Sequence, residues 1–491
     1  MWTRESLYEL VREKLCDYLF IVVSNREPYI HTFSRRKIVS QVPASGLTVA
    51  LDPVMRACGG TWVAHGSGDA DREVVDKDNK VSVPPDEPRY TLKRVWLSKK
   101  EENGYYYGFS NQALWPLCHI VYTRPLFDES DWNTYKKVNG IFAQSVLDEV
   151  GNRKAFVFIQ DYHLALLSRL IKQGNPNIIT AQFWHIPWPN PEAFRICPWQ
   201  KEILHGLLGN DLLGFHIRYH CNNFMDTVER AIEARVDLER YEVTCGGKRT
   251  AVRPFPISVD FEEISREAQK EEVATEIERL KNSLGIGDEM VGIGLDRIDY
   301  TKGIPDRFRA IDHFLEKYPE YHGRMVFIQA GVPSRMQIGA YKKSNEEIDN
   351  LVWEVNWQYA RGLWKPLIYL REHAPPVTLM ALRRMANFCV VSSLHDGMNL
   401  VAKEFVASRF DEDGVLILSP FTGSSRELTD ALLVNPYATD HFADAIKNAL
   451  EMPEMERQKR MRRMRGIVRE NNIYKWAADI VSELVKFEFG G

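Results

Sequence analysis

The segment 396–404, DGMNLVAKE, has residue types and a spacing that suit the binding of an anion. It follows the apolar run 388–393, so a short buried strand leads through a glycine turn into a helix. The first-turn N–H groups of such a helix lack intrahelical partners and lie at the positive end of the helix dipole, which suits a phosphate. Asp396 would then lie where a sugar could bind, and Glu404 where its oxygens could accept from the vicinal hydroxyls of a ribose. A helix N-cap followed by a solvated face has the same pattern.

A second candidate phosphate site is the segment 294–303, GLDRIDYTKG, which also follows an apolar run. Arg297 and Lys302 are separated by a turn, so a forked guanidinium and a point-charge ammonium can converge on one diphosphate. A surface turn with two basic residues explains the same pattern. Gly292 and Gly294 do not form a dinucleotide fingerprint, because Arg297 stands where the last glycine belongs.

Polar side chains in the N-terminal half also follow predicted strands. Arg26 stands at the exit of the first strand, and Asp161 and His185 stand at the ends of two later ones. Because ligands bind outside the carboxyl ends of strands in such sheets, we expect these residues to converge on one edge. His163 is typical of a structural hydrogen-bonding histidine, whereas the prolines after His185 fix its loop and favour function. Gly46 provides flexible backbone after a long polar loop.

Aromatic residues cluster between 105 and 116, a segment with no clear helix or strand period. Its sequence includes Tyr105, Tyr106 and Tyr107, and then Trp115. Such rings stack on the C–H faces of sugars, and they also form plain aromatic cores, so both interpretations stay open here.

Metal and nucleophile sites are disfavoured. Asp69 and Asp71 have the Asp-x-Asp form of some divalent-ion sites, but they lie in a polar Gly-Ser loop with no buried strand before them. His216, His220 and Cys221 would suit zinc only on a helix, and the run 212–216 is typical of a strand end. No Gly-x-Ser-x-Gly, Walker or Ser-x-x-Lys motif occurs. We therefore expect neither a metal nor another cofactor.

The composition limits the partners and the compartment. The chain has 491 residues, 44% of them hydrophobic, and a net charge of −4, so it is long enough for two domains and has no basic excess for nucleic acid or an anionic membrane. Seven dispersed cysteines without a C-x-x-C pair indicate reduced thiols in the cytoplasm. Helical spacing among charges in 1–18 argues against a signal peptide, and no run reaches membrane-spanning length. Small-molecule substrates are the expected partners, and a homo-oligomer stays open.

Apolar runs of strand length alternate with amphipathic stretches, which predicts an α/β fold with parallel sheets. Two prolines near residue 255 stop a helix and stiffen the connection, so we predict domains at 1–255 and 256–472. A helix over 473–487 is expected to pack across the junction, with the tail to 491 joining the first domain. The predicted strands are 19–24, 155–160, 178–184, 212–216, 291–295, 325–330, 367–370, 388–393 and 415–419.

The motifs, taken in order, closely resemble those of the trehalose-6-phosphate synthase family. They are Ser-Asn-Arg at 24–26, Ser-Gly-Leu at 45–47, the Tyr/Trp segment, Asp-Tyr-His at 161–163, His-Ile-Pro-Trp-Pro at 185–189, Arg-x-Asp-Tyr-x-Lys-Gly at 297–303, Pro-Ser-Arg at 333–335 and the segment 396–404. The resemblance implies two Rossmann-like doubly wound domains facing across a cleft, the GT-B arrangement. It also implies transfer of glucose from a nucleotide diphosphate glucose, expected to be UDP-glucose, to glucose 6-phosphate, with retention and without a metal.

By resemblance, residues of the second half bind the donor. Arg297, Lys302 and the amides of Leu400 and Val401 would hold the diphosphate, and Glu404 the ribose. Asp396 and His185 would hold the donor glucose, with Gly46 letting its loop close over it. The remaining donor-loop residues are Gly397, Met398 and Asn399.

The resemblance likewise implies an acceptor site. Arg26 and Arg335 would clamp the acceptor phosphate, Tyr106 and Trp115 would line its pocket, and Asp161 would lie near the acceptor hydroxyls. The residues taking part in catalysis would be Asp161, His185, Arg297, Lys302 and Asp396.

Three departures from the family pattern leave the acceptor open. Ser45 replaces a usual glycine, His65 stands where the best-known bacterial members have an aromatic residue, and the loop 27–44 is longer and carries Arg35, Arg36 and Lys37. A glucosyltransferase acting on glycerol 3-phosphate and a non-catalytic sugar-phosphate-binding relative are the alternatives. The donor base, uridine, guanosine or adenosine, also stays open.

Overall fold

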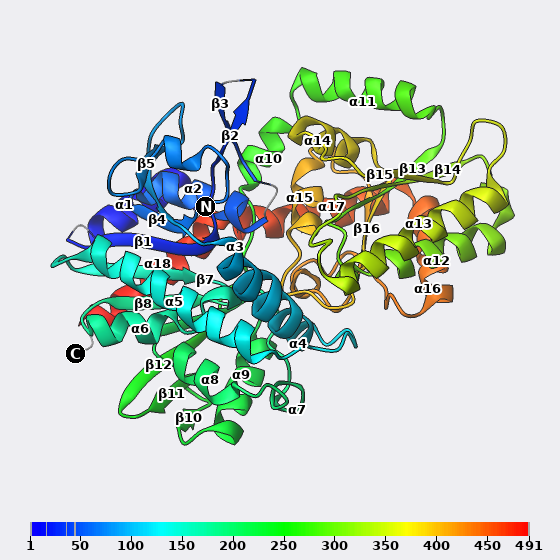
Figure 1. Ribbon diagram of the computed structural model, residues 1–491. Coiled ribbons are helices and arrows are strands. Elements are labelled where there is room, and N and C mark those ends of the chain that lie inside the picture. Colours follow the sequence, from blue (N-terminus) through cyan, green and yellow to red (C-terminus); the bar gives the residue numbers. More distant parts are fainter. Residues whose placement is uncertain (1, 16, 36, 44–45, 490–491) are drawn as a thin grey trace. The chain divides into compact units, whose positions relative to one another are not determined.

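The computed structural model describes residues 2–15, 17–35, 37–43 and 46–489. The chain divides into two compact units: unit 1 comprises Met1–Ile257 and Ile473–Gly491, and unit 2 comprises Ser258–Asn472. The predicted boundary at 255 and 256 lies two residues before the observed one. Each unit contains a largely parallel sheet with helices, which confirms the α/β fold class (Figure 1).

The sheet of unit 1 has the order β10-β11-β12-β9-β8-β7-β1-β4-β6-β5. Its strands are β1 (Leu19–Arg26), β4 (Thr61–His65), β5 (Lys80–Val83), β6 (Tyr90–Val95), β7 (Ala155–Gln160), β8 (Ile179–Phe183), β9 (Leu212–Phe215), β10 (Arg235–Asp237), β11 (Glu242–Cys245) and β12 (Lys248–Pro254). Strands from β12 to β6 pair in parallel, whereas β5, β10 and β11 pair antiparallel at the edges. The central strand β7 is buried along its whole length, as a sheet covered on both faces requires.

The predicted long polar loop at 27–44 is wrong in part, because most of it is a hairpin. Strands β2 (Ile30–Ser34) and β3 (Lys37–Gln41) pair antiparallel, with Phe33 opposite Ile38. The alternation of apolar and polar residues that is typical of strands is not recognisable in the sequence, because these strands contain many polar residues. Arg36 and Ser45 lie outside the described residues. Gly46, predicted to lie in a flexible loop, is the first residue of helix α2.

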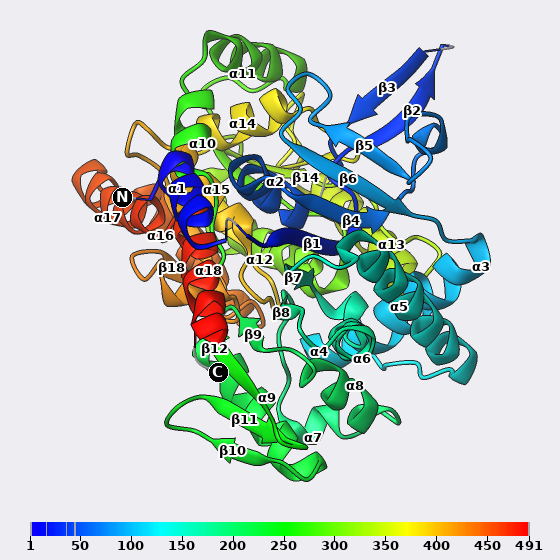
Figure 2. The same cartoon turned by 90° about the vertical axis from the view of Figure 1, so that its left-hand side faces the viewer.

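The C-terminal helix α18 packs within unit 1, against helix α1 and strand β8 (Figure 2). Trp476 donates from Nε1 to the carbonyl oxygen of Phe255 at 3.2 Å, and its ring lies 5.2 Å from that of Phe183. The helix therefore belongs to unit 1, as predicted for the C-terminal segment, and its crossing of the junction stays a prediction. The helices of unit 1 are α1 (Arg4–Lys14), α2 (Gly46–Cys58), α3 (Lys99–Glu102), α4 (Trp115–His119), α5 (Glu129–Val150), α6 (Leu167–Gly174), α7 (Pro191–Phe194), α8 (Gln200–Leu207), α9 (Arg218–Ala231) and α18 (Ile473–Phe489).

Unit 2 has a fully parallel sheet of the order β15-β14-β13-β16-β17-β18. The strands are β13 (Met290–Leu295), β14 (Met325–Ala330), β15 (Leu367–Leu370), β16 (Phe388–Val391), β17 (Val415–Leu418) and β18 (Leu432–Leu433). Alternate residues enter separate cores: Ile293 belongs to one, and Phe327 and Phe388 belong to the other. A Cβ on Gly292 would lie 2.2 Å from the Phe388 ring, so close packing explains this glycine without a dinucleotide.

The helices of unit 2 cover both faces of its sheet. The charged stretch 262–284 forms two helices, α10 and α11, which are separated at 268–270. The basic stretch 457–469 is helical, and several of its arginines pair with carboxylates, as a solvated helix face should. The helices are α10 (Phe261–Glu267), α11 (Glu271–Leu284), α12 (Ile304–Lys317), α13 (Gly339–Tyr359), α14 (Pro376–Met385), α15 (Leu400–Ser408), α16 (Thr439–Glu451) and α17 (Glu454–Glu470).

Candidate active site

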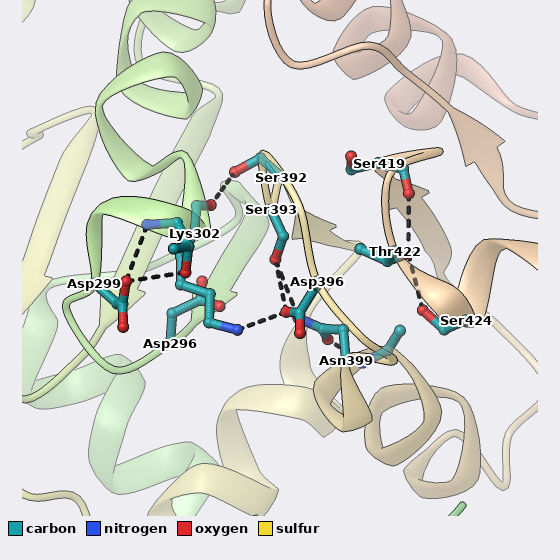
Figure 3. A network of polar contacts seen from close by, with 12 residues as sticks. Asp296, Asp299, Lys302, Ser392, Ser393, Asp396, Asn399, Ser419, Thr422 and Ser424 are labelled. Atoms are coloured by element: carbon teal, nitrogen blue, oxygen red, sulfur yellow. Dashed lines mark hydrogen bonds and ion pairs between the residues drawn. The ribbon is translucent and has the colours of Figure 1, made fainter. Parts of the chain in front are cut away.

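The two predicted phosphate-binding loops of unit 2 lie together. They follow β13 and β16, which are neighbours in the sheet, so both begin at its carboxyl edge. Lys302 donates from Nζ to Oδ2 of Asp396 at 2.5 Å (Figure 3). Two segments almost a hundred residues apart in sequence thus place a cation beside the start of helix α15.

The turn before α15 is held in place on several sides. Asn399 has a positive φ of 75°, caps the helix by accepting from Ala402 N at 3.2 Å, and donates to Asp396 at 3.2 Å. Ser424 N donates to the Met398 carbonyl at 2.9 Å. A Cβ on Gly423 would lie 2.1 Å from the Gly397 carbonyl oxygen, so only glycine allows this close approach. The segment after β17 therefore fixes the turn, and the N–H groups of Leu400 and Val401 occupy the first turn, where helices leave donors unpaired.

Glu404 lies further along α15 and is held by Arg383 of helix α14, whose Nη2 donates to Oε2. Both side chains are largely buried, at 19% and 12% exposed. This guanidinium orients the carboxylate predicted to bind a ribose. Sequence reasoning missed Arg383, since an arginine late in an amphipathic helix carries no distinguishing signal.

A cluster of charged residues surrounds Asp299, close to Lys302 in sequence. Arg335, which has a positive φ of 49°, donates to the Tyr341 hydroxyl and lies 3.5 Å from Oδ2 of Asp299. Burial alone would raise the pKa of Asp299, but the charge of Arg335, with smaller contributions from Lys302 and Arg297, lowers it. Arg335 thus lies with the predicted donor cations of unit 2, whereas Arg26, its predicted partner, belongs to unit 1.

The electrostatics keep Lys302 charged. Burial alone would lower the pKa of this lysine, but Asp396, Asp296 and Asp299 outweigh that effect and raise the pKa above its usual value. Asp296 in turn lies 2.8 Å from Nη2 of the fully buried Arg307. Lys302 is therefore positively charged, which suits an interaction with a diphosphate.

In unit 1, Arg26 and Tyr106 meet at a cavity of about 150 Å³. Arg26 donates from Nη2 to the Tyr106 hydroxyl at 2.9 Å, and the Tyr106 ring stacks on His163 with centroids 5.6 Å apart. The cavity is also lined by Glu27 and His65. A cation, an aromatic ring and a carboxyl group thus line the same cavity, which suits the binding of a charged sugar.

The aromatic segment, whose sequence has no clear helix or strand period, is helical. It forms a π-helix over Asn103–Leu114 that runs directly into α4, and such turns recur at functional sites. Its wider turn hid the period in the sequence. Tyr106 reaches the cavity, but Trp115 does not line it: its side chain is 6% exposed and packs 5.8 Å from the Tyr162 ring. A role of Trp115 at the acceptor stays a prediction.

Asp161 and His185 lie side by side at the ends of β7 and β8. Oδ1 of Asp161 accepts from the backbone N–H groups of Tyr162 at 2.9 Å and His185 at 3.1 Å. Asp161 has φ 72° and ψ 174°, a conformation that is strained for any residue but glycine. Nε2 of His185 lies 2.9 Å from Oε1 of Gln160, and burial lowers the pKa of His185 to about 3. A neutral imidazole donating from Nε2 leaves Nδ1 as an acceptor for a sugar hydroxyl.

A buried charge cluster lies behind the unit 1 cavity. Arg94 donates from Nε to Glu27 at 2.8 Å, and its Nη2 lies 2.8 Å from both Asp71 and Nδ1 of His31. These four residues are at most 6% exposed. Two carboxyl groups thus share one guanidinium, and the pKa of Glu27 rises to about 8, mainly because of burial and then because of Asp71. One proton therefore resides on Glu27 at neutral pH.

This cluster explains the Asp-x-Asp sequence without a metal. Asp71 accepts from Gly68 N at 2.7 Å and His31 N at 2.8 Å, while Asp69 accepts from Phe33 N at 3.0 Å. Among the described residues no group of three or more His, Cys, Asp or Glu side chains could hold a metal ion. His216 follows β9, as predicted, and His220 and Cys221 lie on α9. Glu27 and Arg94 were missed because their partners lie far away in sequence.

Comparison with known proteins agrees with this arrangement. The model of glycosyltransferase family 20 matches residues 18–486. A bifunctional trehalose-6-phosphate synthase/phosphatase of Thermoproteus tenax is 36% identical over 95% of this chain, which spans 63% of that relative's length. A trehalose-6-phosphate synthase of Mycolicibacterium vanbaalenii is 35% identical over 96% of both chains.

Solved structures agree as well. A trehalose-6-phosphate structure from E. coli, bound with UDP-2-fluoro glucose, superposes with a TM-score of 0.85 at 31% identity and covers 95% of this chain and 99% of that one. An α,α-trehalose-phosphate synthase (UDP-forming) from Burkholderia xenovorans, in complex with glucose-6-phosphate, gives 0.85 at 29% with the same coverage. The chain belongs to glycosyltransferase family 20.

Proposed function

We propose that the chain transfers glucose from UDP-glucose to glucose 6-phosphate, with retention, to give α,α-trehalose 6-phosphate. The observation that carries the proposal is the ion pair between Lys302 and Asp396 at the start of α15. It supports a site for a diphosphate and a hexose next to each other. The names of the relatives that cover the whole chain support the same activity.

The donor would bind in unit 2. Its diphosphate would lie against Arg297, Lys302 and the first turn of α15, and its ribose against Glu404, which Arg383 orients. As the glycosidic bond breaks, negative charge grows on the departing diphosphate. Fixed cations and helix-end dipoles stabilise that charge more than they stabilise the ground state, which lowers the barrier.

The acceptor phosphate would lie near Arg26, with the sugar against Tyr106 and its hydroxyls near Asp161. Neutral His185 would accept a hydrogen bond from a hydroxyl of the donor glucose. Arg335 would contribute a further charge to phosphate binding. These roles rest on the resemblance to the family and on the positions described within each unit.

Retention would proceed by front-face attack, with an oxygen of the leaving phosphate accepting the proton of the incoming hydroxyl. Oδ2 of Asp396 already accepts hydrogen bonds from Lys302, Ser393 and Asn399, which lowers the nucleophilicity of this oxygen. Because Arg297 and Lys302 supply the charge that a metal ion would supply, we expect no metal requirement. Cytoplasmic location is part of the proposal, and a homo-oligomer is compatible with it.

The test is acceptor-dependent release of nucleotide. The protein is incubated with UDP-, GDP- or ADP-glucose and with glucose 6-phosphate or glycerol 3-phosphate, and nucleotide diphosphate and the disaccharide are measured. UDP release that requires glucose 6-phosphate supports the proposal. Faster release with glycerol 3-phosphate would assign the alternative acceptor, and no acceptor-dependent release from any donor would indicate a binding role only.

A matched pair of variants tests the leaving-group account. Arg297→Ala should lower the transfer rate by about 10²–10³-fold, the usual effect of losing a transition-state charge contact. The same change at the exposed Lys365, also in unit 2, should leave the rate unchanged. A near-normal rate in Arg297→Ala would refute stabilisation of the leaving group by this residue.

A further inference from the structure

Unit 1 contains a second cavity, of about 390 Å³, whose charged lining residues are all basic. We call it the basic cavity. Arg169 and Lys172 enter it from α6, His205 from α8, and Lys248 from the start of β12. None of the residues assigned to donor or acceptor lines it. Its volume lies within the range of small-molecule sites, about 300–1,000 Å³.

The cations of the basic cavity are poorly neutralised. Lys172 pairs with Asp211 at 2.6 Å, a carboxylate that does not line the cavity. Within the described ranges, neither Arg169 nor Lys248 forms an ion pair, and both are exposed. By contrast, other basic clusters of unit 1 carry their own carboxylates, as Lys80 and Lys93 do with Glu149. Two positive charges thus face one hollow without a counter-charge.

The excess of positive charge affects the pKa of His205, which lines the basic cavity. Burial lowers the pKa of its imidazole, and the positive charge of Arg169 lowers it further. Lys201 acts in the same sense and Glu202 in the opposite one, both from α8, while Nδ1 lies 3.8 Å from Sγ of Cys245 on β11. A bound anion would relieve the repulsion on the protonated imidazole.

The backbone holds the lining in place. A Cβ on Gly209 would lie 2.7 Å from the backbone nitrogen of Arg169, so the loop after α8 packs directly on α6. Gly246 and Gly247 have positive φ values of 57° and 78° and form the tight turn between β11 and β12 that presents Lys248. The cations are therefore brought together by regular elements and a fixed turn.

From these observations we propose that the basic cavity binds a small soluble molecule carrying a phosphate monoester. A phosphate dianion matches the two cations that lack partners, and the hydrogen-bond donors of Arg169, His205 and Lys248 suit its oxygens. The cavity is larger than a phosphate group, so an attached sugar or polyol can enter with it. The inference does not depend on the proposed transfer reaction, because binding is measured without turnover.

The test uses the full chain and inorganic phosphate as the first probe. The pKa of His205 is followed by NMR, with His205→Gln to assign the signal, at constant ionic strength set by chloride. Phosphate should raise the pKa of His205 in a saturable manner. Glycerol 2-phosphate, which carries the same group on a polyol, should do so at lower concentration.

Variants distinguish specific binding of phosphate in the basic cavity from a nonspecific effect of salt. Arg169→Gln and Lys248→Gln should each weaken binding about tenfold, the usual effect of losing a charge-assisted hydrogen bond. Arg12→Gln removes an exposed cation from α1 and should have no effect. Thermal unfolding midpoints show that the variants fold. An unchanged pKa of His205, or equal weakening by Arg12→Gln, would overturn the proposal.

Discussion

Replacing Glu27 by glutamine should make the stability of unit 1 less sensitive to rising pH. The pKa of Glu27 rises from 4.5 to about 8 in the folded protein, because its carboxyl group is buried and lies beside Asp71. Between these values the folded state binds a proton that the unfolded state does not, so wild-type stability falls as the pH rises. Glutamine keeps the shape of a protonated carboxyl group and removes this dependence.

The size of the effect follows from the same pKa. The loss is about 1.4 kcal/mol for each pH unit within the window, and at most about 5 kcal/mol over its whole width. The stability that a raised pKa provides is fully present below pH 4.5 and is lost as the pH approaches 8. The advantage of Glu27→Gln over wild type should therefore grow steadily between these limits.

Urea unfolding followed by tryptophan fluorescence, at several pH values from 5 to 8.5, measures this difference. Glu9→Gln, at an exposed position on α1, is the matched control and should run parallel to wild type. Parallel pH profiles of Glu27→Gln and wild type would refute the shared proton. A steeper fall in the variant than in wild type would refute the raised pKa of Glu27 as well.

Three further predictions concern the candidate active site. Lys302→Met should lower kcat by about 10²–10³-fold in the glucosyl-transfer assay, since it removes a charge that stabilises the departing diphosphate. Because this change also leaves the Asp396 carboxylate without its ion-pair partner, the double variant Lys302→Met/Asp396→Asn should recover stability but not activity. Gly423→Ala should weaken the binding of UDP, measured by calorimetry, because its Cβ would collide with the Gly397 carbonyl. Gly466→Ala is the control and should leave the affinity unchanged, because a Cβ there meets nothing within 4 Å. Equal affinities of the two variants would contradict the packing argument. The imidazole NMR shifts of His185 should stay constant from pH 5 to 8, because burial lowers its pKa to about 3, and a titration near 6.5 would show that the ring is solvated.

The sequence predicted the elements that have a strong local signal. The buried strands that precede both phosphate loops are present, because runs such as β13 and β16 must be apolar on both faces. The pairing of Lys302 with Asp396 was not predicted, because it depends on β13 and β16 being neighbours in the sheet. The other strands were missed, since short or polar strands resemble loops. They are the hairpin β2–β3 and the strands β4, β5, β6, β10, β11, β12 and β18.

The missed site residues depend on tertiary contacts. Arg383 orients Glu404 from a different helix, and Arg94 joins Glu27 to Asp71 across 67 and 23 positions of sequence. A buried arginine and an exposed one look alike in sequence, so burial decides their role. The π-helix over Asn103–Leu114 was invisible for a different reason, because its turn is wider than the helical period that patterns detect.

The position of α18 has a consequence for how the protein is made. Its Trp476 bonds to Phe255 and packs on Phe183, although unit 2 separates these residues along the chain. During translation the first unit therefore lacks part of its own core until the last helix leaves the ribosome, whereas the second is contiguous and can fold earlier. A nascent chain stalled before residue 473 would expose the apolar surface that α18 covers, and this segment is where a chaperone has most to protect.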